Sequence, residues 1–131
     1  MKRTLPLEIG NMGQNFFRSS FENHGFVDKS LERWREVQRR TPGTRAYNQS
    51  TNARRTEAIL VDTGDLRRAV ANSLVRATFS LIRFNVSSDY AIYHNKGTKR
   101  IPQRMFIGRS EIFITRVKKT IIHRFGQALK P

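Results

Sequence analysis

Apolar residues recur at helical spacing in a long segment near the start of the chain. Pro6 fits the first turn of such a helix, where its missing N–H costs no intrahelical hydrogen bond. We therefore predict a helix of about 18–20 residues that begins near Thr4 and stops before Gly25, the expected C-cap glycine. Gly10 and Gly13 each weaken a helix by about 1 kcal/mol relative to alanine, so another segment should pack closely against them. The apolar stripe consists of Ile9, Met12, Phe16, Phe17 and Phe21.

The clearest helical pattern lies at the other end, from Ser110 to Leu129. Ser110 is a favourable N-cap residue, and Glu111 stands in the first turn, where the helix dipole stabilises a negative charge. The apolar stripe is Phe113, Val117, Ile121, Phe125 and Leu129, widened by Ile114 and Ile122. Basic residues fill much of the remaining circumference: Arg116, Lys118, Lys119 and Arg124. We expect the helix to pack its apolar side on a sheet and to present a positive surface on the other side.

Two less regular units separate the first helix from the middle of the chain. Residues 26–40 favour a short helix capped by Asp28 or Ser30, with Trp34 anchoring the segment onto the core. Its apolar positions are Leu31, Trp34 and Val37. Residues 41–57 have no apolar period and contain a Pro-Gly turn signal. Long loops of this kind are functional or disordered, so we expect a mobile loop that becomes ordered against a neighbour; a plain disordered linker is the open alternative.

The middle of the chain favours β-structure. Residues 66–86 are predicted to form a hairpin or two adjacent strands, with the reversal at residues 76–78. The alternation of apolar and polar residues is clearest at Ile82, Phe84 and Val86. A third short strand is expected over residues 101–107, where Pro102 restricts it to a strand start or an edge. Together these patterns predict one α+β domain over residues 1–131, with an N-terminal helix, a small mainly antiparallel sheet, and a long C-terminal helix packed on it.

Charge changes this picture more than composition does. The chain has 25 basic and 10 acidic residues, a net charge of +15. Residues 99–131 alone hold nine basic residues and one acid, which gives +8. Such a field attracts polyanions and favours salt-dependent, sequence-independent nucleic-acid binding, although solubility or an acidic protein partner would also explain it. Because only 37% of the residues are hydrophobic, some stability is expected from neighbouring subunits.

The sequence offers little catalytic chemistry. Without cysteine, neither a disulfide nor a cysteine-based zinc site can form. His24, His94 and His123 lie in no metal-binding spacing, and His94 near Asp89 lacks the second histidine and the carboxylate cluster of a metal-dependent nuclease. Phosphate-loop and nucleophile-elbow motifs are also missing. We therefore expect neither an enzyme nor a bound cofactor. The start of the chain has no apolar run typical of a secretory signal, and no segment is apolar enough to span a membrane.

The stretch from Leu60 to Gly108 combines several local constraints. Residues 63–65, Thr-Gly-Asp, have turn chemistry in which the glycine can take a positive φ. Residues 90–94, Tyr-Ala-Ile-Tyr-His, are too few for a free-standing helix and must pack on other segments. At Gly97 the chain is expected to leave this short helix and turn back as a return segment. In that segment Arg104 lies between the apolar residues Pro102 and Phe106, which are expected to fix it in place. This stretch is built to hold a shape and to present a surface.

The same stretch resembles a known family. The turn L-x-x-T-G-x-L-R, then two strands, and after them the motifs Y-A-x-Y-H-N-x-G-T and I-P-x-R-x-F-I-G together are similar to the pattern of the phage virion morphogenesis (tail-completion, or neck) proteins. The resemblance covers about the last 70 residues well and the first 58 only in outline. The matching residues are Leu60, Thr63, Gly64, Leu66, Arg67, Tyr90, Ala91, His94, Gly97, Ile101, Pro102, Arg104, Phe106 and Gly108.

The resemblance implies a non-enzymatic structural protein that joins or completes the tail or neck at the head–tail junction. It would act in the virion after assembling in the host cytoplasm, as a homohexameric ring that contacts neighbouring connector and tail proteins. The expected subunit or partner interface is Tyr90, Tyr93, His94, Gly97, Pro102, Arg104 and Phe106. From charge alone, Arg116, Lys118, Lys119 and Arg124 are expected to face genomic DNA or an acidic protein surface. The alternative function is a basic, sequence-nonspecific nucleic-acid-binding protein.

Overall fold

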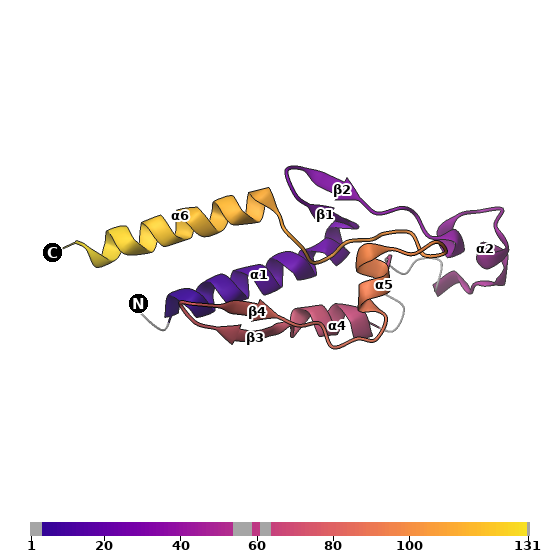
Figure 1. The fold of residues 1–131 in the computed structure, drawn as a ribbon. Coiled ribbons are helices and arrows are strands. Elements are labelled where there is room, and N and C mark those ends of the chain that lie inside the picture. The colour runs from indigo at the N-terminus through magenta and orange to yellow at the C-terminus, as the bar shows by residue number, and fades with distance from the viewer. Residues whose placement is uncertain (1–3, 54–58, 61–63, 131) are drawn as a thin grey trace.

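One long helix lies at the centre of the fold. The computed structural model describes residues 4–53, 59–60 and 64–130. Helix α1 (Thr4–Asn23) is flanked on one side by α6 (Glu111–Ala128) and on the other by the antiparallel strands β3 (Leu74–Ala77) and β4 (Ile82–Phe84) (Figure 1). Helix α6 runs antiparallel to α1, so the described ends of the chain lie at the same end of the fold. The predicted α+β class, with helices at both ends of the sequence and a small antiparallel sheet between them, is confirmed, but α6 packs on α1 and not on the sheet, because α1 lies between them.

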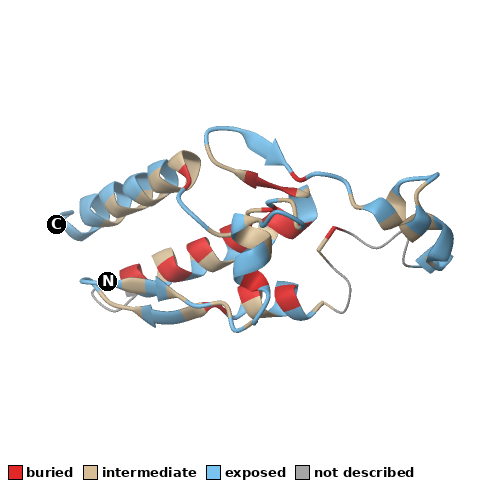
Figure 2. Cartoon of the chain, turned by 45° about the vertical axis from the view of Figure 1, so that its right-hand side comes forward, coloured by how far each residue is buried: buried red, intermediate tan, exposed pale blue. Residues whose placement is uncertain are grey.

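Aromatic side chains of α1 form the core. Phe16 stacks on Phe113 of α6, with 5.0 Å between ring centroids, and Phe17 meets Phe84 of β4 edge-on at 5.1 Å. Phe21 contacts Trp34 edge-on at 5.6 Å. Buried residues consequently follow α1 along its length, whereas α6 is intermediate or exposed throughout (Figure 2). Aromatic pairs in these orientations add about 0.5–1.5 kcal/mol each beyond the burial of their area.

The segment predicted as a short helix over residues 26–40 is a hairpin instead. Strands β1 (Gly25–Val27) and β2 (Leu31–Arg33) pair antiparallel, and a 3₁₀ turn, η1 (Gln38–Arg40), follows. The reason lies at Asp28 and Ser30, because residues that cap helices also favour turns. Here the backbone N–H of Asp28 donates to the carbonyl of Ser30 at 3.1 Å and closes the hairpin turn. The anchoring of this segment by the buried Trp34 is as predicted.

The end of α1 also differs from the prediction in its glycine. His24, not Gly25, takes the left-handed conformation that ends the helix, with φ of 51°. Gly25 serves the hairpin, since a Cβ at this position would lie 2.5 Å from the carbonyl oxygen of Glu32 on the paired strand. The glycine is therefore required for close strand approach.

Part of the predicted loop over residues 41–57 forms a short helix, α2 (Arg45–Gln49). The hydroxyl of Thr44 accepts a hydrogen bond from the backbone N–H of Tyr47 at 3.2 Å and caps its first turn. Residues 54–57 of the predicted loop lie outside the described residues. The expected ordering of this loop against a neighbour stays a prediction.

The strand expected to begin at residue 66 is a helix at first. Helix α4 (Asp65–Ala71) starts after Gly64, whose φ of 82° agrees with the predicted turn glycine; Thr63 lies outside the described residues. Leu66 and Val70 are both buried, and their separation of four residues is helical spacing. The burial of side chains at helical spacing therefore makes this segment a helix, whereas the sequence pattern predicts a strand.

Strands β3 and β4 begin only after α4. They confirm the antiparallel pair predicted near Ile82 and Phe84, but the reversal lies at residues 78–81 and not at 76–78. Thr78 and Leu81 exchange two backbone hydrogen bonds, of 2.8 and 3.3 Å, across this turn. Residues 101–107 form no strand, and their backbone is bonded to other partners, as described below. No helix within the described part of the chain is long and apolar enough to cross a membrane.

The tight contact at Gly13 yields a stability prediction. A Cβ there would lie 2.5 Å from the ring tip of Phe84 and 3.3 Å from that of Phe113, so Gly13→Ala overpacks the core. Overpacking costs about 1–3 kcal/mol and the helix-propensity gain is at most about 1 kcal/mol, so we expect a net loss of about 1–2 kcal/mol. Urea unfolding followed by circular dichroism measures it.

The matched control is Gly126→Ala in α6, where a Cβ would meet no atom within 4 Å. This substitution should stabilise the protein by up to about 1 kcal/mol through helix propensity alone. Equal effects at both positions would contradict the close packing of α1 against β4 and α6.

Candidate functional site

The return segment after α5 (Ala91–Lys96) is held against that helix by a reversal of the chain. Gly97 makes the reversal possible with φ of 76°, and a Cβ there would lie 2.9 Å from the backbone nitrogen of Gln103. The backbone N–H of Arg104 then donates to the carbonyl of His94 at 2.8 Å. The short helix thus packs against the return segment and ends at Gly97, as the sequence predicted.

Asn95 is the residue that fixes this arrangement. Its side-chain oxygen accepts hydrogen bonds from the backbone N–H groups of Phe106 and Ile107, at 2.9 and 3.1 Å. Its side-chain nitrogen donates to the carbonyl of Ile107 at 2.9 Å. One amide side chain therefore replaces the hydrogen bonds that a neighbouring strand would supply, which explains why residues 101–107 do not form the predicted strand.

The other side of the return segment is bonded to the core. The indole N–H of Trp34 donates to the carbonyl of Met105 at 2.8 Å, and the hydroxyl of Ser20 on α1 donates to that of Phe106 at 3.4 Å. Phe106 is completely buried and packs on Phe21 at 5.7 Å between ring centroids. Residues from three distant parts of the sequence thus meet at this segment.

Arg104 is buried within the chain, with 7% of its surface exposed. Its guanidinium donates to the backbone carbonyls of Arg35 and Glu36, at 3.0 and 3.3 Å. Burial lowers the pKa of Arg104; the positive charges of Arg35 and Arg39 lower it further, against the opposing effect of Glu36. The side chain therefore bridges the return segment to the chain after β2. Arg104 and Phe106, two of the predicted interface residues, are thus both buried within the chain, where they hold the return segment in place.

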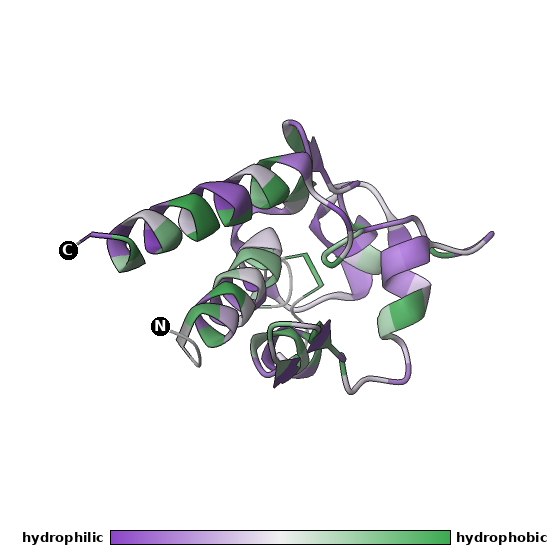
Figure 3. Ribbon diagram, turned by 60° about the vertical axis from the view of Figure 1, so that its left-hand side comes forward, coloured by the Kyte–Doolittle hydropathy of each residue, from purple (hydrophilic) through white to green (hydrophobic). Residues whose placement is uncertain are grey.

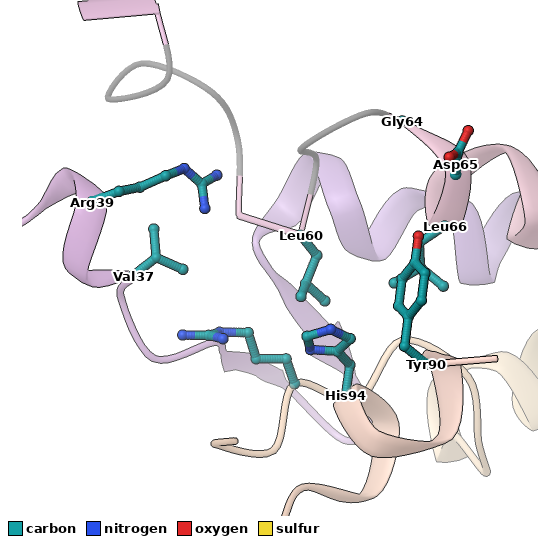
Figure 4. Close-up of a pocket in the computed structure, with 9 residues that line it drawn as sticks. Val37, Arg39, Leu60, Gly64, Asp65, Leu66, Tyr90 and His94 are labelled. Atoms are coloured by element: carbon teal, nitrogen blue, oxygen red, sulfur yellow. The ribbon is translucent and has the colours of Figure 1, made fainter. Parts of the chain in front are cut away.

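A pocket of about 490 Å³ opens between α5 and the start of α4 (Figure 4). His94 of α5 and Tyr90, the N-cap residue of this helix, project toward Leu60 and Leu66, and Arg39 reaches in from η1. The Nδ1 atom of His94 is buried and has no hydrogen-bond partner among the described residues. Burial lowers the pKa of His94, and the positive charge of Arg104 adds to the effect. No group of three or more metal-ligating side chains occurs in the described part of the chain.

Three large side chains of α5 and its N-cap residue are exposed to solvent. Tyr90, Ile92 and Tyr93 expose 43%, 53% and 52% of their surfaces. We call these three residues the α5 face. Of the predicted interface residues, Tyr90 and Tyr93 belong to this face, while His94, Gly97 and Pro102 are half-buried beside it. For these five residues the interface role stays a prediction.

The four basic residues predicted to face a polyanion do not share one environment. Arg124 forms an ion pair with Glu8 of α1 at 3.4 Å, and the guanidinium of Arg116 lies 5.9 Å from the ring centre of Phe16. Lys118 and Lys119 are exposed. The two arginines thus lie beside α1, and of the four only Arg124 is not exposed.

The apolar stripe of α6 is only partly covered. Hydrophobic residues continue to its C-terminal end (Figure 3), yet no residue of this fully described helix is buried. Ile122 and Leu129 expose 72% and 83% of their surfaces. Between α6, the start of α1 and the β3–β4 turn lies a concavity of about 340 Å³, which we call the α6 groove. It is lined by Leu5, Pro6, Ile9, Thr78, Phe79, Ser80, Leu81, Ile82, Val117, Ile121 and Phe125.

Sequence reasoning missed two residues that position these surfaces. Asn95 belongs to the Y-H-N-x-G-T pattern, and its place two residues before Gly97 is the only sequence signal of its role. Asp28 caps α6 from the β1–β2 turn, where its carboxylate accepts a hydrogen bond from the N–H of Glu111 at 2.9 Å. This contact supplements the predicted cap, in which the hydroxyl of Ser110 accepts from the N–H of Phe113 at 3.1 Å. No sequence pattern connects residues 83 positions apart.

Replacing Asn95 tests the support of the return segment. Asn95→Ala leaves two backbone N–H groups without their acceptor, and each unsatisfied group costs about 1–3 kcal/mol, so we expect a loss of about 2–4 kcal/mol. Asn95→Asp keeps the acceptor and should cost less. Chemical unfolding of both variants gives the comparison.

Asn11→Ala, at an exposed position of α1, is the control and should change stability little. A tolerated Asn95→Ala would show that the return segment does not depend on this side chain.

His94 should make stability depend on pH. Its pKa is lowered in the folded chain, so below the ordinary value of about 6.5 the unfolded chain binds a proton that the folded chain does not. Stability should therefore decrease as the pH falls below about 6.5, until the lowered pKa is reached. Urea midpoints between about pH 7.5 and pH 5 measure this decrease, which His94→Gln should diminish.

His123→Gln, at an exposed position of α6, is the matched control and should keep the pH dependence of the unmodified chain. The same dependence in His94→Gln would disprove the assignment to His94.

Comparison with known proteins adds no family assignment. No family model, no curated protein and no solved structure matches this chain. Its function therefore has to be inferred from its own residues and their geometry.

Proposed function

We propose that this chain is a phage structural protein that completes the tail or neck at the head–tail junction by assembling into a ring, without catalysing a reaction. The observation that carries the proposal is the α5 face. Three large side chains, Tyr90 at the N-cap of α5 and Ile92 and Tyr93 within this short helix, are each about half exposed to solvent. Tyrosine and other large apolar residues at a surface are typical of protein interfaces.

The support beneath α5 is the second argument. Asn95 and the Arg104–His94 backbone bond tie the helix to a return segment that is itself bonded to Trp34 and α1. A face that is already ordered loses little conformational entropy when a neighbour binds. Such a preorganised face suits repeated contacts between identical subunits.

Ring formation follows from the kind of contact. When the α5 face of one copy meets a different surface of the next, the contact is heterologous, and copies related by a closing rotation form a ring. The resemblance described for residues 60–108 favours a hexamer. Neighbouring connector and tail proteins would then contact the remaining surfaces, and the ring would be a component of the virion.

Nucleic-acid binding is the second candidate function. The observation that favours it is the exposure of Lys118 and Lys119 on α6, in a chain with a net charge of +15. Such a surface would bind phosphate backbones with a strong dependence on salt and little dependence on sequence.

The assembly proposal is tested by light scattering coupled to gel filtration, over a range of protein concentrations. The unmodified chain should form oligomers, and Ile92→Glu together with Tyr93→Glu should weaken their association at least about tenfold, or about 1.4 kcal/mol, because charge is buried at the contact. Val75→Glu, at a residue of β3 that is 56% exposed, is the matched control and should not change association.

Two results would contradict the proposal. One is a chain that stays monomeric at all accessible concentrations yet binds duplex DNA at near-physiological salt, which would favour the second candidate. The other is a phage particle that assembles at normal yield without this chain.

A further inference from the structure

We propose that the α6 groove binds an acidic, amphipathic segment of a different protein. The inference deepens the proposed function and rests on it in one respect: the partner is another component of the same assembly. The groove is separate from the α5 face, because α1, α6 and the β3–β4 turn line it.

The shape and lining of the groove favour a row of apolar side chains. The side chains at its rim are large and partly in solvent, with Phe79, Leu81 and Phe125 exposing 61%, 38% and 47% of their surfaces. Val117 and Ile121 lie deeper, at intermediate exposure. An apolar groove beside a helix is the usual receptor for one face of an amphipathic segment. Exposed apolar surface that is concave and continuous marks an interaction site.

The charges around the groove specify the rest of the partner. The elements around the groove carry seven basic residues: Arg18 on α1, Arg76 and Arg83 on β3 and β4, and Arg116, Lys118, Lys119 and Arg124 on α6. The three acids on α1 and α6 are each in an ion pair: Glu8 with Arg124 at 3.4 Å, Glu22 with Arg67 at 3.5 Å and Glu111 with Arg109 at 3.2 Å. Carboxylates beside the apolar row of the partner would complement this field.

The same charges disfavour a second copy of this surface. Two identical α6 grooves face to face would bring like charges together, which opposes association. An anionic lipid surface shares the favourable charge, but a flat layer of headgroups leaves a concave groove unfilled. An acidic amphipathic segment satisfies both the shape and the charge.

The test uses labelled synthetic peptides with the full-length chain. One peptide is an 18-residue helix former with leucine at positions i, i+3, i+4 and i+7 and glutamate on the flanks, about the length of α6. A second replaces glutamate with lysine, and a third scrambles the acidic peptide so that its apolar period is lost. Fluorescence anisotropy should show the first binding at least tenfold more tightly than either other peptide, and more weakly at high salt.

Substitutions locate the binding. Phe125→Gln and Phe79→Gln should each weaken binding of the acidic peptide at least tenfold, whereas Val75→Gln, at a similarly exposed residue of β3 outside the groove lining, should not. Because all three positions are exposed, the variants should stay folded, which circular dichroism checks. Light scattering on the same variants should show unchanged self-association, which separates this inference from the proposed function.

Three results would overturn the inference. Equal binding of the acidic peptide and its scrambled form would show that net charge alone attracts it. A change of oligomeric state in Phe125→Gln without peptide would make the groove a contact between copies of this chain. Binding to vesicles of phosphatidylcholine and phosphatidylglycerol that depends on Phe125, without peptide discrimination, would make it a membrane-binding surface.

Discussion

The packing of aromatic rings against α1 is the interaction on which the rest of the structure depends. Phe16, Phe17 and Phe21 occupy successive turns of that helix and receive rings from segments that otherwise share few contacts. The two sheets have only two strands each, and two-stranded ribbons are marginal in water without a surface to pack on. Helix α1 supplies that surface for both hairpins and for α6. The chain thus reaches a stable core with a low share of hydrophobic residues.

Around Phe106, hydrogen bonds from side chains take the place of those that a neighbouring strand would make. An extended backbone in a protein interior needs partners for its polar groups. Around Phe106 these partners come from Asn95, Trp34 and Ser20, not from a neighbouring strand. The hydrogen bonds that hold α5 in place do not use its exposed apolar and aromatic side chains, which remain open to solvent. Support on one side and exposure on the other are what a contact between subunits requires.

The sequence predicted those elements whose burial follows one uninterrupted period. Helices α1 and α6 have such a period, and α6 also has a recognisable N-cap in Ser110, so their positions were predictable. Residues 26–40 and 66–71 were not, because turn residues resemble caps and because Leu66 and Val70 fit a short helix as well as an irregular strand. The structure of residues 101–107 depends on Asn95 and other distant side chains. Likewise the exposed tyrosines were predictable as surface residues, but the inward position of Arg104 depends on carbonyls almost 70 residues away.

The single tryptophan has a consequence that follows from its position. Trp34 sits on Phe21, near the end of α1, with its indole bonded to the return segment. Leu5 and Ile9, which line the α6 groove, lie near the beginning of the same helix. The 16 residues from Leu5 to Phe21 correspond to about 24 Å along the helix axis. Trp34 fluorescence should therefore change when the packing near Phe21 is lost, and should not change when a partner binds the α6 groove. The single tryptophan thus allows unfolding to be followed separately from binding at the α6 groove.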